Sequence, residues 1–320
     1  MNSSKYFHLA FALFICFSCK SKTVQSKTSE KDVSEIEKSE FKSNNSPKLV
    51  LAQWTFNKDL FAGKMTTIDF VNLASELGFE GVEYVSQFFQ DKVEDDKYLS
   101  NLKAAAENAE VVNTMILVDI PDARLGSSDA KERNKSIAEH KKWIVAASKL
   151  DCPTIRVNAH GDGTPEEIIL AVFESVKTLA IFGKNYDVKI TIENHGQYSS
   201  DGKWLSELIG KLVPYGVGSV ADFDNWCIER EGGKLWGSPC IEEYDRYLGI
   251  KELLPTAKSV SLKAFDFDSD GNAIKTDFCK MFQLIKDAQY DEYLAVEFEG
   301  HDIDPIEGIR KTLELVEKCQ

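Results

Sequence analysis

A repeating alternation of strand-like and helix-like segments is the feature that most constrains how this chain can fold. From Lys48 to Gln320, short runs of β-branched and aliphatic residues alternate with longer amphipathic stretches, at a spacing of about 30 to 35 residues per pair. Eight pairs in one uninterrupted series predict an α/β protein whose parallel strands close into a single (β/α)8 barrel, the TIM barrel, because an open sheet would leave unpaired edges. The expected strands cover 49–55, 81–85, 111–119, 154–158, 189–193, 216–222, 259–263 and 293–297.

Local helix signals agree with this spacing. Thr66 or Thr67 can cap the first long helix, and Gly78 follows its end. Thr164 precedes a proline and two acids, which suit the positive end of a helix. After the sixth strand, the Trp- and Gly-rich segment 226–236 is expected to be a loop, followed by a helix over 241–254.

The N-terminal residues are typical of an exported lipoprotein. A lysine near the start is followed by an apolar run, Leu9 to Phe17, which is too short for a bilayer core that needs about 20 residues. Residues 1–18 are therefore predicted to be a signal peptide, with Cys19 as the first mature and lipidated residue, and simple secretion is the alternative. Residues 19–47 are polar and predict a flexible linker, so the barrel, 48–320, is expected to be periplasmic or attached to the membrane by an N-terminal lipid.

Charge and cysteine content exclude some classes of function. The formal net charge of −14 argues against nucleic acid as a partner, because binding to a phosphate backbone needs clustered Lys and Arg. Five cysteines follow the leader, an odd number at wide spacings and without a CxxC pair. This pattern favours free or buried thiols over a zinc site or a disulfide framework. The cysteines are Cys152, Cys227, Cys240, Cys279 and Cys319.

Acidic residues gather at the predicted strand ends, where the active site of a (β/α)8 barrel lies. Converging carboxylates repel each other unless a cation neutralises them, and Mn, Mg or Zn would suit oxygen ligands with a little nitrogen. The predicted ring consists of Trp54, Glu83, Asp119, Asn158, His160, Glu193, His195, Asp222, Asp224, Lys263, Glu297 and Glu299.

Several of these strand-end motifs resemble those of the xylose isomerase-like barrel superfamily, the sugar phosphate isomerase and epimerase group. The resemblance extends over the whole barrel. It is carried by segments 193–196, 222–225, 260–263 and 296–300, with 156–158 on the fourth strand and 140–143 on the third helix. It implies a metal held by Glu, Asp, His and Glu from strands five to eight, as in the ketose epimerases of this superfamily, whose two Glu exchange protons with the sugar.

Transferred to this sequence, the resemblance implies Glu193, Asp222 and Glu297 as metal ligands. The position of the metal-binding histidine is Ser261, and the position of a substrate-gripping histidine is Asn225. A serine hydroxyl is a weak ligand beside an imidazole. Two alternatives therefore stay open: His195, His160 or Asp224 completes a rearranged metal site, or the ammonium group of Lys263 supplies the positive charge.

The leading hypothesis is an enzyme that isomerises or epimerises a sugar or keto-sugar by proton transfer beside a carbonyl, with possible help from a divalent metal. Glu193, Glu297 and Lys263 are the predicted catalytic residues. One alternative is a lyase or hydratase acting on oxidised (keto) glycosides, and another is a non-catalytic, sugar-binding lipoprotein. In each case the partner is a small carbohydrate. The predicted substrate-binding residues are Trp54, Glu83, Asn158, His160, His195 and Asn225.

Overall fold

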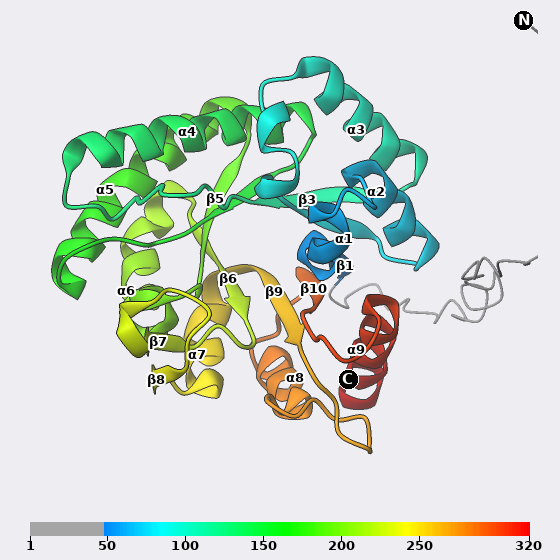
Figure 1. Cartoon of the computed structure of the whole chain (residues 1–320). Coiled ribbons are helices and arrows are strands. Elements are labelled where there is room, and N and C mark those ends of the chain that lie inside the picture. The colour runs from blue at the N-terminus through cyan, green and yellow to red at the C-terminus, as the bar shows by residue number, and fades with distance from the viewer. Residues whose placement is uncertain (1–47) are drawn as a thin grey trace, which may run out of the picture. The chain divides into compact units, whose positions relative to one another are not determined.

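The computed structural model describes residues 48–320 and confirms the closed barrel (Figure 1). The strands follow the order β1-β10-β9-β6-β5-β4-β3-β2, and β10 pairs with β1 to close the ring. All neighbouring strands in the ring are parallel. The strands are β1 (Lys48–Ala52), β2 (Gly81–Val85), β3 (Val112–Leu117), β4 (Thr154–Val157), β5 (Lys189–Glu193), β6 (Gly218–Asp222), β9 (Ala257–Ala264) and β10 (Tyr293–Phe298).

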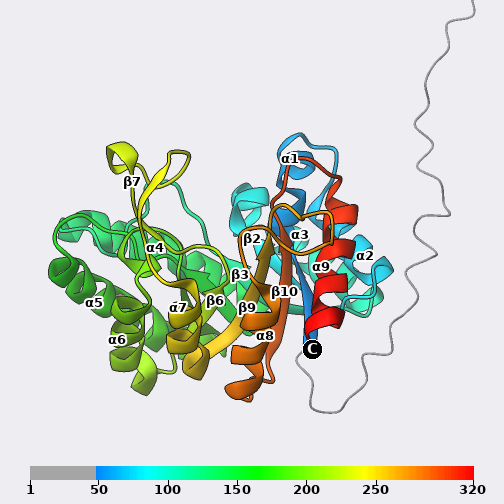
Figure 2. The ribbon, with the colours of Figure 1, turned by 90° about the horizontal axis from the view of Figure 1, so that it is seen from below.

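Helices surround the barrel and cover the outer face of the sheet (Figures 1 and 2). Their apolar sides are buried against the strands, as an amphipathic helix in this architecture requires. None of the helices between residues 48 and 320 is long and apolar enough to cross a membrane. The helices are α1 (Asn57–Phe61), α2 (Thr67–Glu76), α3 (Asp96–Asn108), α4 (Ala130–Lys149), α5 (Pro165–Gly183), α6 (Gly202–Leu212), α7 (Arg246–Leu253), α8 (Phe278–Asp287) and α9 (Pro305–Cys319).

The predicted helix caps at Thr66 and Thr164 are confirmed. The Thr66 hydroxyl accepts the Asp69 N–H at 3.1 Å, and the Asp69 carboxylate accepts the Thr66 N–H at 2.9 Å. Thr164 and Glu167 form the same reciprocal pair at the start of α5. Each such cap stabilises its helix by about 1 kcal/mol.

The inside of the barrel is apolar towards the β2 and β3 side. Val85, Met115, Leu117 and Val220 form a buried cluster, and Trp54 packs against it. Successive residues of a strand point to opposite faces, so Glu83 shares the inward direction of Val85. This alternation brings polar groups of the strands into the barrel.

The segment between β6 and α7 differs from its prediction as a simple loop and a helix over 241–254. It forms an antiparallel hairpin of β7 (Cys227–Arg230) and β8 (Cys240–Glu243), in which Cys227 pairs with Glu243. Helix α7 begins only at Arg246, where Asp245 caps it by accepting two backbone N–H groups. The hairpin projects on the same side of the barrel as α1, which follows the carboxyl end of β1 after one 3-10 turn (Figure 2). It therefore belongs to the carboxyl-terminal face.

The expectation of free thiols is wrong for four of the five cysteines. Cys227 and Cys240 form a disulfide within the hairpin, with Cα atoms 5.8 Å apart. Cys279 and Cys319 join α8 to α9, with Cα atoms 4.6 Å apart. Only Cys152 is a free, buried thiol among residues 48–320. Wide spacing along the chain misled the prediction, because the fold brings distant cysteines together.

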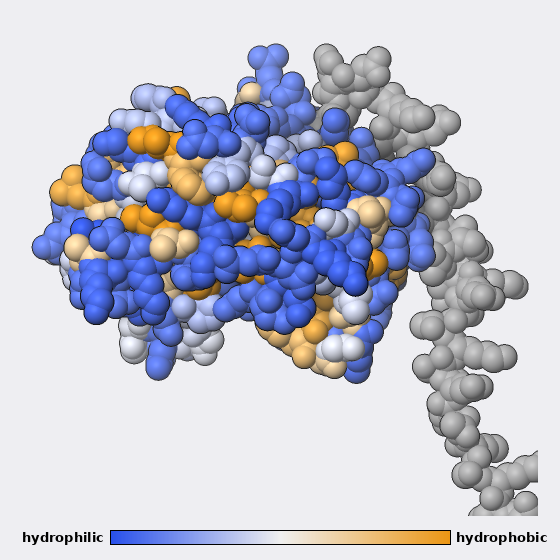
Figure 3. Space-filling view, turned by 90° about the horizontal axis from the view of Figure 1, so that it is seen from above, coloured by the Kyte–Doolittle hydropathy of each residue, from blue (hydrophilic) through white to orange (hydrophobic). Residues whose placement is uncertain are grey.

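The surface drawn in Figure 3 is mostly hydrophilic, with apolar residues scattered singly or in small groups. This agrees with the acidic composition of the chain. The predicted signal peptide 1–18, the lipidation site Cys19 and the linker 19–47 lie outside the described residues.

Candidate active site

A cavity of about 660 Å³ opens at the carboxyl ends of the barrel strands. This is the location expected of a (β/α)8 active site, and the volume lies within the usual range of ligand pockets. The walls come from the carboxyl ends of the eight barrel strands or the residues that follow them, including the segment after β3, and from the β7–β8 hairpin. They include Trp54, Asp119, Arg124, Arg156, Asn158, His160, Glu193, His195, Asn225, Trp236, Lys263, Glu297 and Glu299.

Arg156 organises one half of the site. Its Nη1 donates to Asp119 Oδ1 at 2.6 Å and to Asn158 Oδ1 at 2.9 Å, and Asn158 Nδ2 donates to Asp119 Oδ1 at 2.7 Å. Arg156 Nε lies 2.7 Å from Glu193 Oε2. That contact is an ion pair without hydrogen-bond alignment, since neither atom forms a hydrogen bond with the described residues. The positive charge of Arg156, on β4, therefore holds the Glu193 carboxylate, at the end of β5, in place.

Lys263 organises the other half. Its Nζ lies 3.4 Å from Asp222 Oδ2, 3.7 Å from Glu297 Oε1 and 3.0 Å from Glu299 Oε1. These carboxylates outweigh the effect of burial and raise the pKa of Lys263 well above its usual value, so it stays protonated. The Ser261 hydroxyl, two residues earlier on β9, donates to Glu297 Oε2 at 3.0 Å.

Asp222 has a supporting place in this arrangement. Its Oδ1 accepts the backbone N–H groups of Asp224 at 2.8 Å and Asn225 at 2.9 Å. The side chain of Asn194 donates to the Asp222 carbonyl at 2.9 Å and accepts the Asp222 N–H at 2.8 Å. Asp222 is fully buried and does not line the cavity. Asp222 thus holds the Lys263 ammonium group from the buried side of the site, and its hydrogen bonds orient the turn that carries Asn225.

The two candidate proton-transfer residues both have raised pKa values. Burial raises the pKa of Glu193 to about 7, although the charge of Arg156 opposes the shift. Burial also raises the pKa of Glu297 well above its usual value, against the charge of Lys263. Asp119 differs, because Arg156 overcomes the effect of burial and lowers its pKa. Two acids at the cavity thus hold a proton more tightly than ordinary carboxyl groups, a property typical of acid–base residues.

Both predicted histidines line the cavity in a neutral state. His160 Nε2 is 2.7 Å from the backbone oxygen of His195, and the two rings are stacked with centroids 6.1 Å apart. Burial lowers the pKa of each ring. His195 Nδ1 is buried and makes no hydrogen bond with the described residues. This nitrogen is therefore a buried polar group without a partner among residues 48–320, next to the cavity wall that the ring itself lines.

The predicted substrate contact through Glu83 does not fit its position. Glu83 lies deeper in the barrel, where its Oε1 accepts the Ser259 hydroxyl at 2.5 Å, and it does not line the cavity. The other predicted substrate-binding residues, Trp54, Asn158, His160, His195 and Asn225, do line it. Asn225 Nδ2 donates to Glu193 Oε1 at 3.3 Å.

The predicted metal ligands do not fit a divalent cation in this arrangement. The charge of the Glu193 carboxylate is balanced by Arg156, and Asp222 and Glu297 face the ammonium group of Lys263. A metal ion among the same carboxylates would lie beside this ammonium group and be repelled by it. No group of three His, Cys, Asp or Glu side chains within 48–320 has the arrangement of a metal site. Of the two alternatives left open by the sequence, the geometry favours the lysine.

Sequence reasoning missed several cavity residues. Arg156 was noted only as part of a motif, although a charged residue inside the buried strand Thr-Ile-Arg-Val is a clear signal of a polar partner. Arg124 and Gln197 lie in irregular segments without a recognisable motif. His140, from α4, also lines the cavity, and burial lowers its pKa to about 4.

Comparisons with known proteins agree on the fold. The family described as Xylose isomerase-like TIM barrel matches residues 71–319. No curated protein matches the sequence significantly. Similar solved structures include D-psicose 3-epimerase from Clostridium cellulolyticum, which is 13% identical with a TM-score of 0.62 over 85% of this chain and 98% of that chain. A 3-keto-D-glucoside 4-epimerase from E. coli is 15% identical with a TM-score of 0.60 over 86% and 100%. D-allulose 3-epimerase from Methylomonas sp. is 12% identical with a TM-score of 0.63 over 86% and 99%.

Proposed function

Because the chain belongs to the xylose isomerase-like TIM barrel family, we propose that it is an isomerase or epimerase of a sugar or keto-sugar. The observation that carries this proposal is a pair of buried glutamates at one cavity, Glu193 and Glu297, each beside a fixed cation, Arg156 or Lys263. The structural neighbours support the choice of substrate class, since those named above are epimerases of ketoses or of a keto-glucoside. At such low identity, the chemistry must be argued from the residues of this chain.

In the proposed reaction, one glutamate removes the proton from the carbon beside the carbonyl of the sugar. Glu193 is suited to this role, because its pKa of about 7 leaves a part of it ionised at neutral pH. The electron pair left on carbon moves to the carbonyl oxygen. The Lys263 ammonium group lines the cavity and would stabilise this oxyanion.

The second glutamate returns a proton. The pKa of Glu297 is well above its usual value, so its carboxyl group holds a proton more tightly than an ordinary one. It would donate this proton to carbon from its own side of the cavity, while the electron pair returns from the oxyanion and the carbonyl forms again. After the reaction Glu193 is protonated and Glu297 is ionised, and proton exchange with solvent restores the starting state. The Ser261 hydroxyl bonds to Glu297 and orients it. No step of this scheme requires a divalent metal.

Hydrogen exchange tests the proposal directly. The purified protein would be incubated in deuterated water with a panel of ketoses and C3-oxidised hexoses, and deuterium at the carbon beside the carbonyl would be measured by NMR. We expect exchange in the wild type and its loss in Glu193→Gln and Glu297→Gln. Exchange or turnover that survives in both variants would sink the proposal.

Product analysis separates this function from its alternatives. An epimerised or isomerised sugar supports the proposal, whereas release of an aglycone from a keto-glycoside indicates a lyase. Binding of sugars without exchange or products indicates a non-catalytic binding protein.

A further inference from the structure

The β7–β8 hairpin forms one wall of the cavity. Residues 233–236, in the segment that connects β7 to β8, line the cavity together with the carboxylates and cations of the site. The Trp236 ring lies 4.7 Å from the ring of His195. Trp236 is nevertheless 40% exposed, so part of the indole is available to a ligand.

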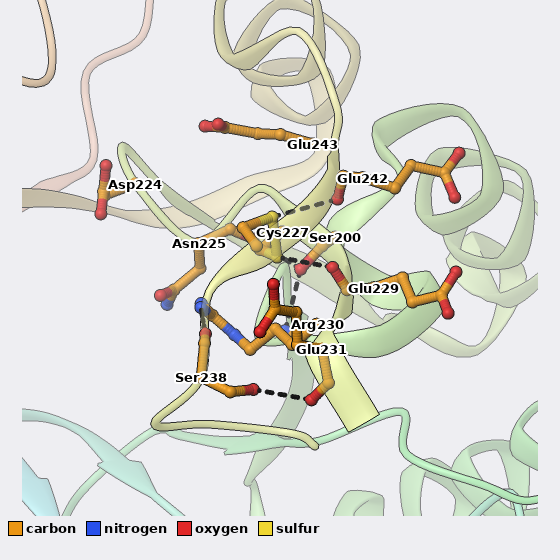
Figure 4. The surroundings of a disulfide bond; sticks show 12 residues. Ser200, Asp224, Asn225, Cys227, Glu229, Arg230, Glu231, Ser238, Glu242 and Glu243 are labelled. Carbon is orange, nitrogen blue, oxygen red and sulfur yellow. Dashed lines mark hydrogen bonds between the residues drawn. A yellow bond between two sulfur atoms is a disulfide. The ribbon is translucent and has the colours of Figure 1, made fainter. Parts of the chain in front are cut away.

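Several contacts hold this wall in shape. The Cys227–Cys240 disulfide joins the first residue of β7 to the first residue of β8 and so crosses the hairpin diagonally. Arg230 Nη1 donates to the Ser238 carbonyl at 2.9 Å, and the Ser238 hydroxyl donates to the Glu231 carbonyl at 3.0 Å (Figure 4). The Arg230 guanidinium also lies 5.7 Å from the centre of the Trp236 ring, which is within the range of a cation–π contact. These contacts therefore hold the connecting segment of the hairpin, including Trp236, in a defined conformation.

Gly196, directly after His195, leaves room for this wall. A Cβ atom at this position would lie 2.7 Å from Leu235 Cδ1 and 3.3 Å from Trp236 Cζ2. Its φ of +89° is also one that other residues rarely adopt. The β5 motif and the hairpin thus fit closely together, and the hairpin adjoins the same loop that carries His195.

We propose that Trp236 and His195 form a second subsite, which binds the outer ring of a glycosidic substrate while the oxidised ring lies between Glu193 and Glu297. This inference rests on the proposed function. Exposed aromatic rings beside polar groups are suited to one face of a sugar. A single hexose is small for a cavity of about 660 Å³, whereas a disaccharide would extend from the carboxylates to the hairpin. The substrate class is therefore a keto-glycoside.

Substitution of Trp236 tests the subsite. The probes are a free C3-oxidised glucose and a C3-oxidised glucosyl disaccharide, and the measured quantity is the ratio of their kcat/KM values. We expect Trp236→Ala to lower the preference for the disaccharide about tenfold, mainly through KM, and Trp236→Phe to restore most of it. An unchanged ratio, or an equal loss for both probes, would overturn the subsite.

The two disulfides provide a matched pair of variants. Cys227→Ser/Cys240→Ser releases the hairpin, whereas Cys279→Ser/Cys319→Ser removes the crosslink between α8 and α9, which does not line the cavity. We expect only the first pair to raise KM for the disaccharide, with circular dichroism to confirm that both proteins fold. Equal effects of the two pairs would contradict the role of the hairpin.

A binding measurement keeps this inference distinct from the proposed function. Titration of Glu193→Gln with the oxidised disaccharide would be followed by tryptophan fluorescence, with and without the additional Trp236→Phe change. Quenching that depends on Trp236 supports the subsite even if no sugar is turned over. Turnover of free keto-sugars without this signal refutes the subsite and leaves the proposed function intact.

Discussion

Glu193 and Glu83 are both buried glutamates on barrel strands, and burial raises the pKa of each to about 7. Their surroundings differ. Glu193 ends β5, lies beside Arg156 and lines the cavity. Glu83 occupies the middle of β2 and contacts the Ser259 hydroxyl inside the barrel. A raised pKa is therefore no sufficient sign of a catalytic acid, and access to the cavity separates the two residues.

Glu193→Gln tests whether the glutamate that lines the cavity acts in catalysis. The amide keeps the shape of the side chain but cannot take up a proton, so we expect turnover to fall by about 10²- to 10⁴-fold. Steady-state kinetics on a sugar identified by deuterium exchange would measure the loss. The melting temperature should change little, and a variant that retains turnover would place Glu193 with Glu83 as a structural acid.

Lys263→Met tests whether the ammonium group beside the carboxylates of the site is essential for stability and turnover. The change leaves Asp222, Glu297 and Glu299 without their shared counter-charge, which we expect to cost about 3–5 kcal/mol of unfolding free energy as well as most of the turnover. Urea unfolding and kinetics measure the two effects. Lys263→Arg is the control, because it retains the charge, and equal stability of both variants would contradict the ion-pair role.

Glu83→Gln tests whether the glutamate inside the barrel has only a structural role. Below about pH 4.5 the Glu83 carboxyl group is protonated in both the folded and the unfolded chain. Between pH 4.5 and about pH 7 the unfolded chain has already lost this proton, whereas the folded chain still holds it. The wild-type protein therefore loses stability as the pH rises through this range. We expect the variant to be more stable than the wild type at pH 8, by about 1–3 kcal/mol, and similar at pH 4.5.

Urea unfolding at both pH values would measure this difference, with the exposed Glu80→Gln as the control. Turnover should fall far less than in Glu193→Gln. A loss of activity as large as that of Glu193→Gln would show that the interior position does not exclude a catalytic role.

Ser259→Ala is expected to have the smallest effect. It removes the hydroxyl that donates to Glu83, and the loss of one buried hydrogen bond costs about 1 kcal/mol or somewhat more. The measurement is again urea unfolding, at pH 5 where Glu83 is protonated. A fall in turnover without a fall in stability would contradict the structural role of this pair.

Much of the barrel could be predicted from the sequence, because its strands and helices follow from local periodicity and caps such as Thr66 and Thr164. The ring of strand-end residues followed from the same reasoning. Glu83 was misplaced although its strand was predicted correctly as 81–85: Glu83 is the middle residue of β2, two positions before Val85, so its side chain lies deeper than that of a strand-end residue. The depth of a residue in a barrel depends on its distance from the end of its strand, and residues two positions before that end point into the interior.

Other features depend on contacts between distant parts of the chain. The salt bridges of Arg156 join β4 to the end of β5 and to the segment after β3, and no local pattern specifies them. The same holds for the β7–β8 hairpin, whose short strands carry mostly exposed residues. Its sequence lacks the alternation of apolar and polar residues that signals a half-buried strand.

The disulfide of the hairpin also has a consequence for where the protein matures. Disulfides persist in oxidising compartments and are rare in a reducing cytosol, so a cytosolic copy of this chain would hold Cys227 and Cys240 as thiols. We propose that export, for which residues 1–18 are the predicted signal, is the step that completes the binding site. Before export, the wall beside His195 would lack this crosslink.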